Sequence, residues 1–276
     1  MYSVPMNSDS KAYLHTAIEA AHAAAAIHRY YLSGVGGNLH IDTKSSDIDI
    51  VTRVDKECEA KIREIILERY PEHVVLGEEE GQNSGESAYR WVVDPLDGTV
   101  NYTHGFPFYC VSIGLEINGS IALGVVLDSV RNELFSAVRG EGSYCNGSPI
   151  HVSATRELRQ ALLSTGFPYD PEKIAASVEV FARMMQHCRA IRRPGAAALD
   201  LCHVACGRFD GFWERKLSPW DVAAGWLIIQ EAGGTVTGPG GEPYRLEEKT
   251  MVASNGHLHA QLLEKLQLGN PSLAQP

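Results

Sequence analysis

The chain lacks an excess of positive charge, a long hydrophobic run and a regular spacing of cysteines. Its 276 residues contain 24 Lys and Arg against 34 Asp and Glu, which gives a formal net charge of −10. This charge argues against binding to nucleic acid or to an anionic membrane, although it leaves room for a local basic patch. The alanine-rich run 20–26 is too short to span a bilayer and predicts part of a helix.

The polar first ten residues do not resemble a secretory signal, and the six cysteines are scattered rather than arranged as a disulfide framework. Both features favour a cytoplasmic protein with free thiols. Cys202 and Cys206, with His203 between them, form a superficially metal-like grouping. The segment 196–205 is apolar at helical spacing, however, so buried free thiols are the preferred interpretation.

The most informative feature present is the run 94–99, which reads Asp-Pro-Leu-Asp-Gly-Thr. The preceding residues 90–93 predict a buried strand that stops at the Asp-Pro pair, because proline cannot donate to a sheet. Two carboxylates would then emerge at the carboxyl end of a strand, where divalent cations such as Mg²⁺ prefer oxygen ligands. Gly98 and Thr99 would offer amides and a hydroxyl to a phosphate. A simple Asp-Pro turn with a helix N-cap remains the alternative.

Further acids stand in similar settings on both sides of this run. Residues 74–76 predict a short strand that leads to a glutamate triplet at 78–80, and residues 48–55 alternate like a strand that ends at Asp55. Asp221 precedes a helical stretch over 222–231. Taken singly, the triplet is also typical of a solvated acidic loop, and Asp221 of a helix N-cap. Their combination with residues 94–99 favours a metal-assisted site.

These motifs resemble the inositol monophosphatase family. Four segments are similar to the family's motifs and stand in its order, over roughly residues 44–234: 51–55, 76–79, 94–102, and 220–225 followed by 230–234. The segments 165–168 and 192–201 resemble bacterial members most.

The second half of the chain alternates predicted strands and helices, which indicates an α/β sheet covered by helices. The resemblance implies a layered αβαβα sandwich, of the kind that inositol monophosphatase shares with fructose-1,6-bisphosphatase. We expect an N-terminal α+β half over 1–150 that carries most metal ligands, and a C-terminal α/β half over 151–276 that completes the active site.

The resemblance also implies two or three Mg²⁺ ions. Glu78, Asp94 and the Leu96 carbonyl would hold the first ion, and Asp94, Asp97 and Asp221 would hold the second. A weaker third ion would lie near Glu78 and water. We assign Glu78 rather than Glu79 as the ligand, because Glu79 would point to the opposite side of a strand.

Catalysis in the family implies that Thr99 orients or deprotonates the attacking water, while Asp55 accepts the hydrogen bond of the Thr99 hydroxyl. A threonine hydroxyl is a poor base by itself, so this role depends on metal and on Asp55. Thr99 is equally typical of a helix N-cap, and both roles can hold together.

The substrate side follows from the resemblance as well. Gly98 and Thr99 amides would bind the phosphate, and Asp97 and Asp221 would lie near the substrate. Gly195, Ala197 and Glu214 would line the alcohol side, although Glu214 is also typical of a solvated acid at a strand end. Ala196 stands where relatives often have a hydroxyl. Lys44 resembles a lysine near the family's mobile metal loop, and a solvated loop lysine is the alternative.

The implied activity is Mg²⁺-dependent hydrolysis of a small phosphate monoester, with myo-inositol monophosphate as the leading substrate, and inhibition by Li⁺. Fructose 1,6-bisphosphate, histidinol phosphate and 3′-phosphoadenosine 5′-phosphate are the alternatives. A role as a transcription antitermination partner belongs to a different class of function. The resemblance also implies a homodimer, with contacts near 109–111 and 135–137, and gives no reason to expect membrane or nucleic-acid binding.

Overall fold

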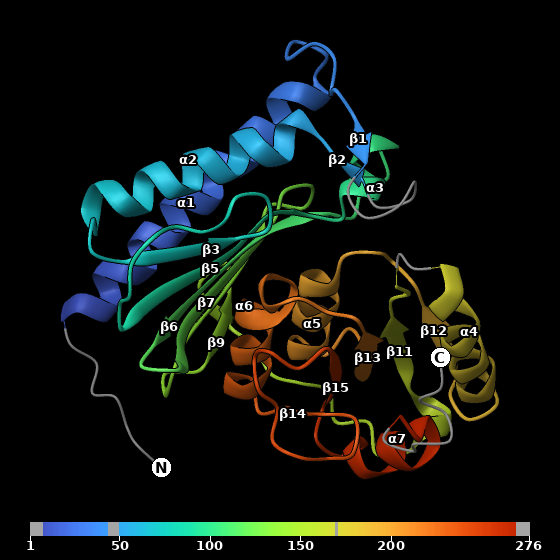
Figure 1. Cartoon of the computed structure of the whole chain (residues 1–276). Coiled ribbons are helices and arrows are strands. Elements are labelled where there is room, and N and C mark those ends of the chain that lie inside the picture. Colours follow the sequence, from blue (N-terminus) through green and yellow to red (C-terminus); the bar gives the residue numbers. More distant parts are fainter. Residues whose placement is uncertain (1–7, 44–49, 169–170, 269–276) are drawn as a thin grey trace.

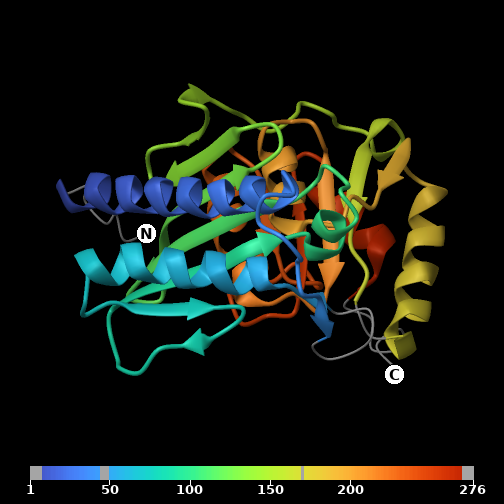
Figure 2. The same cartoon turned by 90° about the horizontal axis from the view of Figure 1, so that it is seen from above.

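The computed structural model describes residues 8–43, 50–168 and 171–268. Its elements form five layers in the order helix, sheet, helix, sheet, helix (Figure 1). The three helical layers are the pair α1 (Ser8–Leu32) and α2 (Arg53–Arg69), the pair α5 (Ala197–Ala205) and α6 (Pro219–Glu231), and the pair α4 (Pro171–Met185) and α7 (His259–Leu266). The predicted αβαβα sandwich is confirmed. Seen from above, α1 and α2 lie side by side across the first sheet (Figure 2).

The first sheet has eight strands in the order β10-β9-β8-β7-β6-β5-β3-β4. All its pairs are antiparallel except β3 with β5. Its strands are β3 (Val74–Gly77), β4 (Gly81–Gln82), β5 (Tyr89–Asp97), β6 (Cys110–Ile117), β7 (Ser120–Asp128), β8 (Glu133–Val138), β9 (Ser143–Cys145) and β10 (Ser148–Pro149). The apolar pattern of the sequence predicts strands over 110–117 and 133–138, and β6 and β8 have these bounds.

The second sheet has five strands in the order β12-β11-β13-β15-β14. β11 pairs in parallel with β12 and β13, whereas β15 runs antiparallel to β13 and β14. Its strands are β11 (Leu162–Thr165), β12 (Ala190–Arg192), β13 (Gly211–Arg215), β14 (Thr235–Thr237) and β15 (Thr250–Ser254). The remaining short elements are the pair β1 (Asp42–Thr43) and β2 (Ile50–Val51), the helix α3 (Thr99–Thr103) and the 3₁₀ turn η1 (Leu158–Gln160). The division of the chain at residue 150 stays a prediction.

Small residues let α6 approach the first sheet closely. A Cβ added to Gly124 on β7 would lie 2.6 Å from the carbonyl oxygen of Ala224, and one added to Gly114 on β6 would lie 3.0 Å from the Cβ of Ala223. Glycine at both strand positions and alanine on the helix thus set the spacing of the two layers. This contact fixes the second half of the chain against the sheet that carries Asp94.

The segments predicted to lie near a dimer contact are interior strands. Tyr109 and Phe135 are 5% and 0% exposed, because β6 lies between β5 and β7, and β8 lies between β7 and β9. The dimer contact near these segments stays a prediction. Nearby turns do expose apolar side chains, namely Phe106 at 53% and Val130 at 40%.

All six cysteines are free, and Cys202 is buried as predicted, whereas Cys206 is only half-buried. None of the helices in the described residues combines the length and the apolar composition needed to cross a bilayer.

Candidate active site

The run with the two aspartates lies inside β5 rather than beyond its end. Asp94 pairs with Ser112 and Asp97 with Cys110, so β5 continues past Pro95 through a β-bulge. The prediction that the strand stops at Asp94 is wrong, because the extra residue of the bulge accommodates the missing N–H of proline. The bulge keeps both carboxylates buried, at 2% and 9% exposure.

A histidine from α1 holds the middle of this bulge. His28 is fully buried, and its Nε2 lies 3.1 Å from the Pro95 carbonyl oxygen while its Nδ1 lies 2.9 Å from Ser129 Oγ. The carbonyl can only accept, so Nε2 carries the proton and Nδ1 accepts from the serine hydroxyl. Burial lowers the pKa of His28 to about 3, which keeps this tautomer neutral. No local motif in the alanine-rich helix signals this role.

Thr99 and Asp55 meet as predicted. The Thr99 hydroxyl lies 3.0 Å from Asp55 Oδ1 and 3.1 Å from the Leu96 carbonyl oxygen, so its single proton is shared between two acceptors. Thr99 is the first residue of α3, and Gly98 is the N-cap with a φ of 97°. A Cβ on Gly98 would also lie 2.9 Å from the Phe108 carbonyl oxygen. The N-cap alternative for Thr99 is therefore wrong, and the position before it requires glycine.

Asp55 lies in the first turn of α2 and not at the end of a strand. Thr52 caps this helix, and Asp55 Oδ2 accepts both the Thr52 amide at 2.7 Å and the Thr52 hydroxyl at 2.6 Å. This reciprocal capping box starts the helix at Arg53, which limits β2 to Ile50–Val51. Asp55 is thereby fully buried, with its Oδ1 directed to Thr99.

Asp221 occupies the same position in α6. Ser218 is the N-cap, and its amide donates to Asp221 Oδ2 at 2.6 Å. The N-cap interpretation of Asp221 is therefore wrong, because the cap is Ser218, three residues earlier. The adjacent Trp220 carbonyl oxygen accepts from Ser112 Oγ on β6 at 3.3 Å, which ties the start of α6 to the first sheet.

The second half of the chain reaches Asp97 through the start of α5. The amides of Ala197 and Ala198 donate to the two oxygens of Asp97 at 3.2 and 2.7 Å. Burial raises the pKa of Asp97 to about 7, against the lowering effect of these amides and with a further rise from the charge of Glu78. Asp97 thus joins the two halves of the chain.

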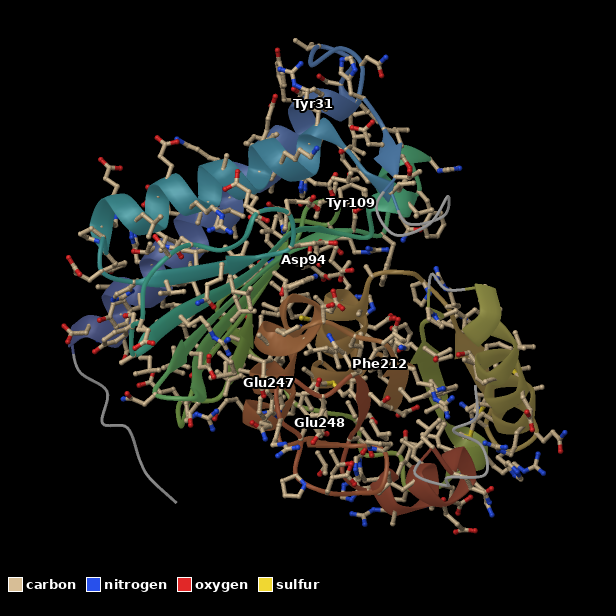
Figure 3. The ribbon with its side chains drawn as sticks, viewed as in Figure 1. Tyr31, Asp94, Tyr109, Phe212, Glu247 and Glu248 are labelled. Atoms are coloured by element: carbon tan, nitrogen blue, oxygen red, sulfur yellow. The ribbon has the colours of Figure 1, made fainter. Side chains whose placement is uncertain are left out.

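Asp94 lies where the first sheet meets the second half (Figure 3). Burial and the charges of Glu78, Asp97 and Asp221 raise its pKa well above the ordinary value. These four predicted ligands therefore act on one another, and they come from β5, from the turn after β3 and from α6. Within the described part of the chain, no three His, Cys, Asp or Glu side chains already stand close enough together to hold a metal ion. The fit to a cation rests on the chemistry of the donor set, in which the buried Asp94 and Asp97 and the half-buried Glu78 and Asp221 all carry the same charge.

Glu214 on β13 faces Gly166, where an added Cβ would lie 2.1 Å from its carboxylate oxygens. Burial, followed by the charge of Asp221, raises the pKa of Glu214 to about 8, and Arg193 opposes the rise. Part of the Glu214 surface still reaches solvent although protein atoms surround its carboxylate. Gly195 has a φ of 94°, and Asn101 Nδ2 ties its neighbour Pro194 to α3 by donating to the Pro194 carbonyl oxygen at 2.8 Å.

A sequence model of the inositol monophosphatase family matches residues 9–269, which is nearly the whole chain. The chain belongs to the inositol monophosphatase family. Members of this family are metal-dependent phosphoric monoester hydrolases.

The similar relatives include proteins named as inositol monophosphatases and proteins named Nus factor SuhB. An inositol-1-monophosphatase from Synechocystis sp. is 42% identical over 261 residues, which cover 94% of this chain and 90% of the relative. A Nus factor SuhB from Pseudomonas aeruginosa is 45% identical over 225 residues, which cover 79% and 83%. The solved structure of an inositol monophosphatase from Anabaena (Nostoc) sp. aligns with a TM-score of 0.83 at 42% identity and covers 96% of this chain and 99% of that one.

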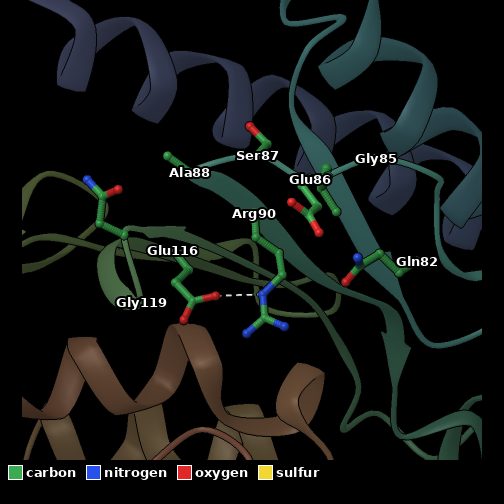
Figure 4. Close-up of a pocket in the computed structure, with 10 residues that line it drawn as sticks. Gln82, Gly85, Glu86, Ser87, Ala88, Arg90, Glu116 and Gly119 are labelled. Atoms are coloured by element: carbon green, nitrogen blue, oxygen red, sulfur yellow. Dashed lines mark hydrogen bonds and ion pairs between the residues drawn. The ribbon is translucent and has the colours of Figure 1, made fainter.

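One predicted site residue is not described by the structure, and one pocket lies away from the predicted site. Lys44 lies outside the described residues. A pocket of about 300 Å³ opens at the other end of β5, around Arg90 and Glu116 (Figure 4). The Arg90 guanidinium pairs there with Glu116 at 2.5 Å and with Glu247 at 3.7 Å, so its positive charge is already compensated.

Asp200 is a further site residue to which the sequence assigned no role. It lies in the first turn of α5, is 1% exposed, and its Oδ1 makes no hydrogen bond with any described residue. Burial and the charges of Glu214 and Asp97 raise its pKa well above the ordinary value. The carboxylate-rich region therefore extends from the predicted metal ligands into the second half of the chain.

Proposed function

We propose that this protein hydrolyses phosphate monoesters with Mg²⁺, and that myo-inositol monophosphate is its preferred substrate. The observation that carries the proposal is the carboxylate set around the buried Asp94, in which burial and then three neighbouring charges raise the pKa of Asp94. Such a set is costly without a cation and favourable with one. Free cysteines throughout the chain support a cytoplasmic location as part of the proposal.

We assign Glu78, Asp94 and the Leu96 carbonyl to one ion, and Asp94, Asp97 and Asp221 to a second, with a weaker third near Glu78. Holding these ions requires the carboxylates to close further around them than they stand now. Bound Mg²⁺ would activate water, neutralise the phosphate and stabilise the leaving oxygen. Leu96 can serve although its carbonyl oxygen accepts from Thr99, because a carbonyl oxygen has two lone pairs.

The Thr99–Asp55 pair is proposed to orient the attacking water. Both Thr52 donors already occupy Asp55 Oδ2, so Oδ1 is the oxygen that receives the Thr99 proton. With that proton directed to Asp55 or to Leu96, the Thr99 oxygen presents a lone pair to a water in the site. Asp55 and the Leu96 carbonyl together therefore set which way the Thr99 hydroxyl points.

On the substrate side, we assign the phosphate to the amides of Gly98 and Thr99. Glu214 and Gly195 would line the alcohol side, with Asp97 and Asp221 between alcohol and phosphate. The Ala197 amide already donates to Asp97, so Ala197 would contribute its position in the wall rather than its N–H. Glu214 is the residue that would distinguish a polyhydroxy alcohol from a simple leaving group.

The deciding experiment is a phosphate-release screen with Mg²⁺ over myo-inositol 1-phosphate, fructose 1,6-bisphosphate, histidinol phosphate and 3′-phosphoadenosine 5′-phosphate. We expect the highest kcat/KM with the inositol ester, and a loss of at least about a hundredfold in Asp94→Asn, since removing a charged metal ligand removes metal-assisted catalysis. Activity of Asp94→Asn close to that of the wild type at saturating Mg²⁺ would contradict the ligand assignment. A preference for another ester would change the substrate but not the reaction.

A second candidate function is suggested by the 45% identity to a protein named Nus factor SuhB. The protein would then act as a partner of the transcription machinery, in addition to or in place of hydrolysis. The net charge of −10 favours a protein contact over a nucleic-acid contact. Affinity capture from a lysate of the source organism, with and without nuclease, tests this: recovery of RNA polymerase subunits in both samples supports it, and recovery of none contradicts it.

A further inference from the structure

A buried glutamate on α2 accepts hydrogen bonds from the turn that carries Glu78. Glu59 is 0% exposed, and its carboxylate accepts the amide of Glu79 at 2.7 Å and the amide of Glu80 at 3.0 Å. These are the two residues directly after Glu78. A carboxylate that receives two successive backbone amides fixes the path of that backbone more firmly than a neutral acceptor would.

Arg63, one turn further along α2, completes this connection. Its Nε donates to Glu59 Oε1 at 2.9 Å, and its side chain is only 9% exposed. Its other nitrogens donate to the carbonyl oxygen of Val75 on β3 at 3.1 Å and to that of Gly81 on β4. The Glu59–Arg63 pair is thus hydrogen-bonded to both strands and to the turn between them. A guanidinium can bond to both strands at once because it presents several donors in a fixed plane.

The same carboxylate explains the glycine that precedes Glu78. A Cβ added to Gly77 would lie 2.3 Å from the Glu59 carboxyl carbon and from its Oε1. The φ of Gly77 is not in the left-handed region, so backbone strain does not require glycine here. Glycine is required because the Glu59 carboxylate occupies the space of a side chain at position 77. The Leu-Gly-Glu-Glu motif therefore depends on Glu59, a residue of α2 outside the motif.

We propose that Glu59 is a positioning residue for metal binding: it holds the β3–β4 turn that carries the proposed ligand Glu78. The inference rests on the proposed function, in which Glu78 is a metal ligand. The amides of Glu79 and Glu80 are held against α2, and Glu78 directly precedes them, so the position of its backbone depends on this contact.

The test is Glu59→Gln, measured by binding of Mn²⁺ to the metal-free protein from the electron paramagnetic resonance signal of free Mn²⁺. Glutamine keeps the size of the side chain but brings an NH₂ group against a backbone N–H. It also removes the nearer charge partner of Arg63, which among the described residues keeps only Glu80, at 3.6 Å. We expect Mn²⁺ affinity to fall about 10- to 100-fold, as is usual when a residue that orients a ligand is lost. At saturating Mg²⁺, phosphate release should recover to within a few-fold of the wild type.

A purely structural role predicts a different pattern, and Ile66→Ala is the matched control. Ile66 lies on α2, is fully buried, and belongs to the hydrophobic core. Both variants should lower the melting temperature of the metal-free protein, but only Glu59→Gln should weaken Mn²⁺ binding. Equal Mn²⁺ affinity in the two variants would overturn the positioning role.

Gly77→Ala keeps the proposal testable if Glu59→Gln does not fold. The added methyl should displace the Glu59 carboxylate and weaken Mn²⁺ binding by a similar factor. In a Glu59→Ala background the carboxylate is gone, so adding Gly77→Ala should cause no further loss. Additive losses from the two substitutions would contradict the proposed contact.

Glu78→Gln separates this inference from the proposed function. If Glu78→Gln binds Mn²⁺ like the wild type, the metal assignment itself fails, and the positioning role fails with it. If Glu78→Gln loses binding while Glu59→Gln and Gly77→Ala retain it, only the role of Glu59 is overturned. Loss in all three variants supports both.

Discussion

Asp94→Asn should stabilise the metal-free protein although it abolishes the proposed catalysis. Burial and three neighbouring charges raise the pKa of Asp94, so its ionised form is unfavourable in the folded state. Asparagine has nearly the same size, and its side-chain oxygen can keep the 3.0 Å hydrogen bond that Asp94 Oδ1 accepts from the Leu96 amide. The substitution therefore removes a charge without opening a cavity.

The sign follows from proton linkage. A carboxyl whose pKa is raised by folding binds more protons folded than unfolded, so the free energy of unfolding falls as the pH rises. Its stabilising contribution is fully present below an unfolded pKa of about 4 and is lost as the pH passes the folded pKa. For Asp97, the rise from 3.8 to about 7 corresponds to about 4 kcal/mol, at about 1.36 kcal/mol per unit.

The neighbouring Asp94 follows the same direction. Removing its charge also relieves the repulsion on Asp97, and we expect Asp94→Asn to recover on the order of 2 kcal/mol near pH 8. That is a rise of about 4 °C in the melting temperature for a chain of this length. The gain should shrink steadily as the pH is lowered towards about 4, where the native Asp94 also carries a proton in the folded state.

The assay is urea unfolding followed by circular dichroism between about pH 4.5 and pH 8, in a chelator and then in Mg²⁺. Glu141→Gln, at an exposed carboxylate in the turn before β9, is the control and should match the wild type at every pH. In Mg²⁺ the order should reverse, because only the wild type gains binding energy from the ion. If Asp94→Asn is less stable than the wild type near pH 8 without metal, the proposed repulsion is refuted.

Three further outcomes are expected. Glu214→Gln should lower kcat/KM for inositol monophosphate by about ten- to a hundredfold near pH 9, where the native carboxyl is ionised, since a charged hydrogen bond is worth about 1.5–3 kcal/mol. Hydrolysis of p-nitrophenyl phosphate by this variant should hardly change. Equal losses with both substrates would indicate a metal or folding defect. Li⁺ at fixed Mg²⁺ should inhibit phosphate release by competing at the Asp97–Asp221 position, and complete indifference at high Li⁺ would remove this expectation. Sedimentation should show a homodimer, with the exposed Phe106 and Val130 turns as the first candidates for the contact, whereas a 30.1 kDa species alone at micromolar concentration would contradict it.

The elements that sequence reasoning placed well are those that local pattern determines. Residues 110–117 and 133–138 are apolar stretches rich in branched side chains, and they form β6 and β8 with the predicted bounds. The bulge in β5 has no signal in the sequence, because an Asp-Pro pair is typical of the end of a strand. Only the partner strand reveals that pairing resumes at Asp97.

The supports of the site could not be found from the sequence, because their partners are distant along the chain. His28 reaches Pro95 across 67 residues, and Glu59 reaches Glu79 across 20. Neither belongs to a motif with a fixed spacing, since a helix can present a side chain to a strand wherever the packing brings them together. Contacts of this kind depend on the layer arrangement, which is settled by the burial of many apolar residues at once.

Asp55 and Asp221 show a third case, in which a local signal was present but carried two meanings. Thr52 and Ser218 each stand three residues before an aspartate, which is the spacing of a capping box, and both boxes form. In each, one carboxylate oxygen accepts the amide of the capping residue. The other oxygen of Asp55 accepts from Thr99, and the charge of Asp221 acts on Asp94 and Glu214. Starting the helix therefore orients the carboxylate for chemistry. A substitution at either aspartate removes a helix cap and a site group together, so activity loss alone cannot separate the two, and the Thr52 and Ser218 positions are where the capping contribution can be measured separately.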